Sequence, residues 1–122
     1  MNTTTQVPVT QNEAWGFYGA MQEQASNAWP QACTAISDAT GQSLESVRAF
    51  LDSRFGRHFA DDVLNALDEG MTLQDAIHAA TGRWMGWTIG SQTSKQYGIP
   101  QGMPYLTGFV VYSEIADELL AA

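Results

Sequence analysis

The most informative shortage in this sequence is of positive charge. Only five of its 122 residues are Lys or Arg, against 13 Asp and Glu, and the formal net charge is −8. All five basic residues fall between Arg48 and Lys95, so the two ends carry acidic charges alone. Phosphate binding depends on clustered Lys and Arg that release counterions. We therefore expect no direct binding to nucleic acid or to an anionic membrane.

Cysteine and long apolar runs are also scarce. Cys33 is the single cysteine, which excludes an intramolecular disulfide framework and a zinc site built on several cysteines. The first residues lack the basic and apolar regions of a signal peptide, and no apolar run approaches the roughly 18 residues of a membrane span. We expect a cytoplasmic protein.

Catalytic motifs are missing as well. The sequence contains no Gly-x-Ser-x-Gly and no glycine-rich phosphate loop. Cys33 lies in an alanine-rich helical stretch with Ala32 and Ala35, where a cysteine usually serves as a small buried apolar residue. We expect no catalytic residue and no enzymatic activity.

Two histidine clusters are the only candidates for a metal site. His58 lies three and four residues before Asp61 and Asp62, and Asp75 lies three before His78. Each cluster can share a helix face, but one pair supplies two ligands where a metal needs three or four. The spacing leaves open whether the two clusters meet in space. We expect solvated helix pairs, with no metal and no cofactor.

What is present indicates a packed domain. Apolar residues make up 44% of the chain and aromatic residues 11%, with four tryptophans. This composition is typical of a globular core. We expect residues 1–9 to be a flexible polar tail and residues 10–122 to form a single helical domain.

The first helices follow from capping signals and apolar spacing. Thr10 and Glu13 form a capping box that starts a helix, and Pro30 is expected to interrupt it. A second helix is predicted from Pro30 to Ala39, with Gly41 as its left-handed end. Ser43 is expected to cap a third.

The third helix is expected to end at Gly56 and to bury Leu44, Val47, Phe50, Leu51 and Phe55. A fourth helix runs to Gly70, and Thr72 caps a fifth. Pro104 suits the first turn of the last helix, which is expected to turn inward Tyr105, Phe109, Val111, Tyr112, Ile115 and Leu119. The pattern predicts an all-α bundle of five or six helices.

Three glycines at four-residue spacing, Gly82, Gly86 and Gly90, mark the most unusual segment. In a soluble helix each glycine costs about 1 kcal/mol relative to alanine, so close packing must recover the loss. We expect these glycines to pack within the bundle, and the alternative is contact with a second protein chain. The large residues between them, Trp84, Met85 and Trp87, step around a helix at roughly 100° intervals and cannot all enter one core.

A second distinctive segment follows at residues 97–104, where two prolines and two glycines exclude a regular element. Prolines restrict the unbound loop and lower the entropy lost on docking. Aromatic and Met residues are favoured interface anchors. The predicted binding residues are therefore Trp84, Met85, Trp87, Tyr97, Met103 and Tyr105.

The stretches 83–90, 97–100 and 104–109 resemble small accessory proteins of conjugative and integrative mobile elements. The resemblance covers the last third of the chain and carries no catalytic residues with it. It implies action against host defence, as in anti-restriction or anti-CRISPR inhibitors, many of which are small and acidic.

We therefore hypothesise a non-enzymatic inhibitor that binds a basic, nucleic-acid-binding subunit of a defence complex through an acidic and aromatic surface. A DNA mimic fits less well, because the acids are dispersed. The alternative is a structural or regulatory module that forms a homodimer through the glycine face, and a small-molecule enzyme ranks third.

Overall fold

The structure is a computed structural model that describes residues 16–21 and 25–121, with side chains described for 16–21 and 28–113. Its helices are α2 (Phe17–Ala20), α3 (Ala25–Thr40), α4 (Leu44–Asp52), α5 (Arg54–Asp68), α6 (Leu73–Gly86), α7 (Ser91–Tyr97) and α8 (Tyr105–Ala121). Within these ranges the only β pairing is one isolated bridge between Thr88 and Pro104. The all-α prediction is confirmed. The described helices number seven: α7 adds to the predicted set, whereas α2 lies within the first predicted helix.

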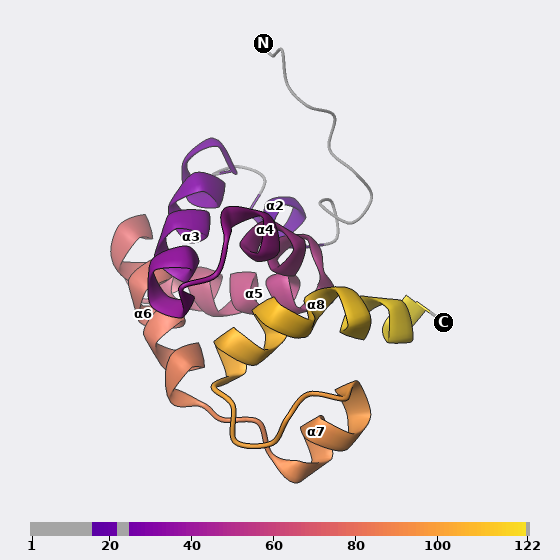
Figure 1. Cartoon of the computed structure of the whole chain (residues 1–122). Helices are drawn as coiled ribbons and strands as arrows, with labels where there is room; N and C mark the ends of the chain where they lie inside the picture. Colours follow the sequence, from indigo (N-terminus) through magenta and orange to yellow (C-terminus); the bar gives the residue numbers. More distant parts are fainter. Residues whose placement is uncertain (1–15, 22–24, 122) are drawn as a thin grey trace, which may run out of the picture.

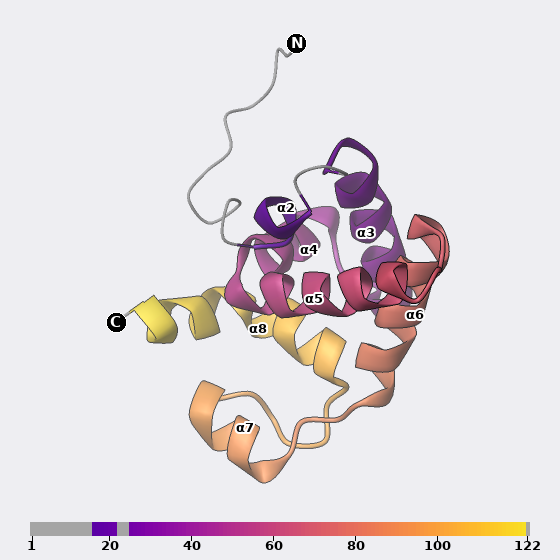
Figure 2. The ribbon, with the colours of Figure 1, turned by 180° about the vertical axis from the view of Figure 1, so that it is seen from behind.

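Helix α5 lies at the centre of the arrangement (Figure 1). Helices α2, α3 and α4 lie on one side of it and α6 packs along it, while α8 packs mainly against α4 and α6 (Figure 2). Helix α7 lies at the edge of the molecule, on the side of α8 away from α3 and α4. The predicted tail and the Thr10 capping box lie outside the described residues.

The local end signals are mostly confirmed. Gly41 and Gly70 have φ values of 73° and 97°, the left-handed conformation that ends a helix at little cost for glycine. Ser43 accepts a hydrogen bond from the Ser46 amide, and Thr72 accepts one from the Asp75 amide. These side chains satisfy amides that the first helical turns leave unpaired.

Pro30 does not interrupt a helix, so that prediction is wrong. Helix α3 runs through it from Ala25 to Thr40. Ala28, Ala32 and Ile36 are fully buried along one stripe that spans the proline, while Pro30 itself is exposed. Burial of this continuous stripe keeps the helix intact past the hydrogen bond that proline cannot make.

Gly56 does not stop a helix either. Helix α4 ends at Asp52, and buried Ser53 joins it to α5: its hydroxyl donates to the Phe50 carbonyl and accepts from the Phe55 amide. Gly56 lies inside α5, where an added β-carbon would overlap the backbone of Leu51. The glycine therefore allows the two helices to approach closely at their junction.

The core lies between α5 and its neighbours. Its largest fully buried side chains include Phe17, Ile36, Phe50, Leu51, Phe59 and Leu106. Two predicted core residues are instead exposed: Leu44 by 60% and Val111 by 45%. Helix α8 buries Leu106, Phe109, Val110 and Ser113, a stripe shifted from the predicted one, whose Ile115 and Leu119 lie outside the described side chains.

Candidate protein-binding surface

The candidate surface lies where α6 ends. After Gly86 the chain becomes extended at Trp87, with φ −83° and ψ 145°. The Tyr105 amide donates to the Trp87 carbonyl at 2.6 Å, and the Ile89 amide donates to the Met103 carbonyl at 2.8 Å. The Gly102 amide donates to the Ile89 carbonyl at 2.8 Å. These bonds pair the segment after α6 with the segment before α8.

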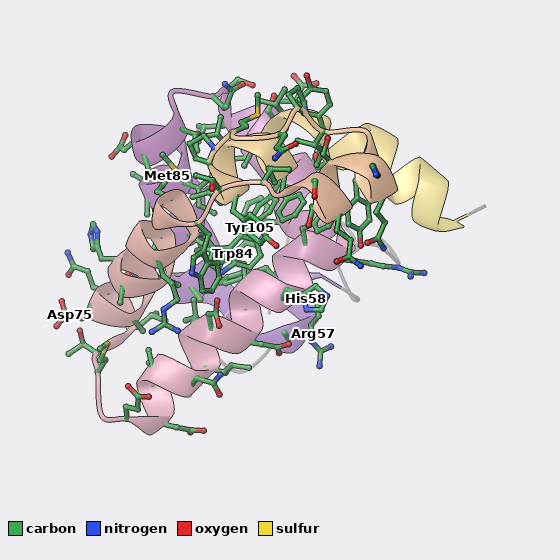
Figure 3. All side chains as sticks on the ribbon, turned by 90° about the horizontal axis from the view of Figure 1, so that it is seen from below. Arg57, His58, Asp75, Trp84, Met85 and Tyr105 are labelled. Atoms are coloured by element: carbon green, nitrogen blue, oxygen red, sulfur yellow. The ribbon has the colours of Figure 1, made fainter. Side chains whose placement is uncertain are left out.

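Trp84 is a core residue and not a surface anchor, so its prediction as a binding residue is wrong. Its side chain is only 4% exposed. The indole lies between α5 and α8 near Tyr105 (Figure 3), and its Nε1 donates to Asp62 Oδ2 on α5. Its ring lies 5.5–6.3 Å from the rings of Phe50, Phe59, Trp87, Tyr105 and Phe109. The sequence had no signal for the Asp62 acceptor, which is 22 residues away.

Trp87 is the exposed member of the predicted set. Its side chain is 44% exposed, yet its ring lies 5.8 Å from Tyr105 at 77° and 6.3 Å from Trp84 at 43°. Its carbonyl is held by the Tyr105 amide. An exposed aromatic side chain fixed at both backbone and ring loses little further entropy when a partner covers it.

Met85, Tyr105 and Met103 are half-buried around this position. Met85 Sδ accepts a hydrogen bond from Thr107 Oγ1 at 3.7 Å, which ties the end of α6 to α8. The structure thus brings Met85, Trp87, Met103 and Tyr105 to one end of the molecule.

Tyr97 is also half-buried, but it lies on α7 and packs on a different pair of rings. It contacts Phe55 at 5.3 Å and Phe109 at 6.2 Å, both edge-on. Tyr97 therefore packs against the core from α7 and keeps part of its side chain exposed.

The glycine prediction is wrong for the described residues. Gly82, Gly86 and Gly90 are exposed, and a β-carbon at any of them would meet no described atom within 4 Å. Helix α6 ends at Gly86, so Gly90 belongs to a different segment. Gly82 and Gly86 lie on the side of α6 opposite buried Trp84. The described glycines that permit another backbone to approach closely are Gly16 and Gly56, both against Leu51.

The acidic residues around α6 lie at its N-terminal end. The turn before it carries exposed Asp68 and Glu69, its first turn carries exposed Asp75, and Met71 between them is 41% exposed. We call residues 68–75 the acidic turn. No Lys or Arg occurs between Arg57 and Arg83. The 14 residues of α6, roughly 20 Å of helix, thus separate the acidic turn from Trp87.

The histidine clusters do not meet. His58 extends from α5, whereas Asp75 lies at the far end of α6 (Figure 3). Among the described residues no three His, Cys, Asp or Glu side chains form a group that could hold a metal ion.

Cys33 is buried on α3. Burial raises the pKa of its thiol from 9.0 to about 11; the Asp52 carboxylate also raises it, and Arg48 opposes the shift. At neutral pH this group is the protonated thiol and lacks the nucleophilic form.

No known protein family, curated protein or solved structure matches the chain. Among the described residues no helix is both long and apolar enough to cross a membrane.

Proposed function

We propose that the protein is a non-enzymatic binding module that docks on a basic protein surface through the outer side of α6, between the acidic turn and Trp87. In the setting that the sequence resemblance implies, the partner is a nucleic-acid-binding subunit of a host-defence complex, and docking inhibits it. The observation that carries the proposal is Trp87, a large aromatic side chain held in place by the fold and left 44% exposed.

The shape of this surface supports docking. Gly82 and Gly86 leave the backbone of α6 uncovered in the last turns before Trp87, so a partner can approach the helix there more closely than it could approach side chains. Tryptophan, tyrosine and methionine are enriched at the centres of protein interfaces, where a few residues supply most of the binding energy.

Charge supports a basic partner. The acidic turn carries three exposed acids, and the chain as a whole has a net charge of −8. A surface that binds nucleic acid is basic, so it attracts this protein and accelerates association. Arg83 is exposed next to Trp87 and forms no ion pair with the described residues. The contact at that end of α6 is therefore expected to be apolar or to include one acid of the partner.

Self-association is the second candidate, because the open Gly82 and Gly86 face also suits a second copy of the chain. Sedimentation of the purified protein separates the two. A monomer up to high micromolar concentration favours docking on another protein, whereas a dimer that Gly82→Leu disrupts favours self-association.

Affinity capture from the natural host, with matched variants, tests the proposal. Leu44→Ala is the control, since Leu44 is 60% exposed on a different helix. We expect the wild type and Leu44→Ala to retain the same basic protein and Trp87→Ala to lose it, with all three equally folded by circular dichroism. Equal retention by all three would count against the Trp87 surface.

A further inference from the structure

Residues 90–98 include α7, and they are held by buried residues on either side but by few contacts in between. The residues on either side, Ile89 and Ile99, are each only 1% exposed. Both isoleucines pack over Gly108 of α8: a β-carbon there would lie 3.1 Å from Ile99 Cγ2 and 3.4 Å from Ile89 Cγ1. The segment is thus pinned at both of its ends.

Between these pins the attachment is slight. Helix α7 has seven residues and none of them is buried. A helix this short is unstable without tertiary contacts. Both ends of the segment are glycines: Gly90 is exposed, and Gly98 is left-handed with φ 69°. The chain can therefore change direction at both points with little steric resistance.

Tyr97 makes the aromatic contacts that hold α7 against the core. Its ring meets Phe55 and Phe109 edge-on, at 83° and 89°. Those two rings are stacked on each other, 4.0 Å apart, and each is 4% exposed. Among the described residues the Tyr97 hydroxyl interacts only with the side chain of the neighbouring Gln96, at an exposed position.

We propose that residues 90–98 form a strap that opens while the rest of the fold stays intact, with Tyr97 as its latch. Opening moves the Tyr97 ring away and uncovers the stack of Phe55 and Phe109. Tyr105 lies 4.9 Å from Phe109 and 5.8 Å from Trp87, so the uncovered rings extend the aromatic surface at the end of α6. This inference does not depend on the proposed function.

Native-state hydrogen exchange of the full chain, with increasing low concentrations of urea, tests the strap. The amides of α7 and its cap that are bonded within the strap, those of Ser94 and Gly98, are compared with amides in the middle of α5. We expect the α7 amides to exchange faster and with almost no dependence on urea, because local opening exposes little surface. If the two groups of amides show the same protection and the same urea slope, the strap does not open by itself and the proposal is wrong.

The latch is tested with a matched pair of variants. Edge-to-face contacts between aromatic rings each contribute a measurable free energy. Tyr97→Ala removes both of these contacts and is expected to accelerate hydrogen exchange of the α7 amides about tenfold or more. Tyr97→Phe keeps the ring and is expected to stay within about twofold of the wild type. Binding of an apolar fluorescent dye should increase for Tyr97→Ala alone. Unchanged exchange or unchanged dye binding in Tyr97→Ala would overturn the latch. If Tyr97→Ala fails to fold, the urea series on the wild type still decides.

Discussion

Replacing Asp62 tests whether a hydrogen bond between helices fixes Trp84 at the centre of the fold. The Trp84 indole is 4% exposed and its N–H donates to the Asp62 carboxylate. In Asp62→Ala the buried N–H loses this acceptor. An unpaired buried donor costs about 1–3 kcal/mol, and the better helix propensity of alanine returns roughly 0.5 kcal/mol. We expect the free energy of unfolding to fall by about 1.5 kcal/mol.

A double-mutant cycle separates this bond from other effects of the substitution. Trp84→Phe removes the donor, so Asp62→Ala should cost little in that background. The coupling free energy is therefore expected to be about 1–2 kcal/mol. Asp62→Asn keeps an acceptor oxygen and should lie between Asp62→Ala and the wild type. Urea denaturation followed by far-UV circular dichroism, with linear extrapolation, measures the four proteins of the cycle and Asp62→Asn. Additivity within about 0.5 kcal/mol would refute the reasoning.

Three further predictions concern glycine packing, capping and the buried thiol. Gly56→Ala should lower the free energy of unfolding by about 1–3 kcal/mol or more, because the alanine β-carbon would overlap the Leu51 backbone, whereas Gly82→Ala should raise it by up to about 1 kcal/mol. Thermal unfolding measures both variants, and shifts of the same sign would show that the two glycines do not differ in packing. Ser53→Ala should lower the free energy of unfolding by more than the roughly 1 kcal/mol expected for Ser43→Ala, because Ser53 is buried and its hydroxyl bonds to both α4 and α5. Urea denaturation measures both variants, and equal losses would argue against this. Burial raises the pKa of the Cys33 thiol from 9.0 in the unfolded chain to about 11 in the fold, so the thiol contributes fully to stability below pH 9 and loses this contribution as the pH rises toward 11. Cys33→Ala should therefore lose less stability than the wild type between pH 9 and 11, and identical pH profiles of the free energy of unfolding would contradict this.

The features that the sequence predicted correctly depend on neighbours along the chain. Ser43 and Thr72 cap helices because their side chains reach amides three residues on, and Gly70 ends α5 because of its own backbone conformation. Local propensity contains this information. It does not show when packing overrides it, as at Pro30, where a buried stripe continues through the proline.

The packing role of glycine is the feature that local sequence predicts least well. Four-residue spacing suggested close packing at Gly82 and Gly86, yet both face away from the core. Gly56 looked like a helix end and is instead a close-packing position against Leu51. The difference depends on which segment lies opposite each glycine, and spacing along one helix does not determine that.

The candidate surface was predicted in part. The 100° step between residues indicated that one of the large residues near the glycines would be exposed, and Trp87 is that residue. The sequence did not indicate the pairing of Trp87 with Tyr105, or that Ile89 and Ile99 would pin the strap over Gly108. These contacts join separate segments and arise only when the chain folds.

The most direct test of the central claim is the affinity of the captured basic protein for three purified proteins, measured by titration calorimetry at fixed salt. Trp87→Ala is expected to weaken binding about 30-fold or more, the size of an interface hot spot, while Leu44→Ala stays within about twofold of the wild type. The same affinity for all three proteins, with their folds intact, would contradict docking through the end of α6.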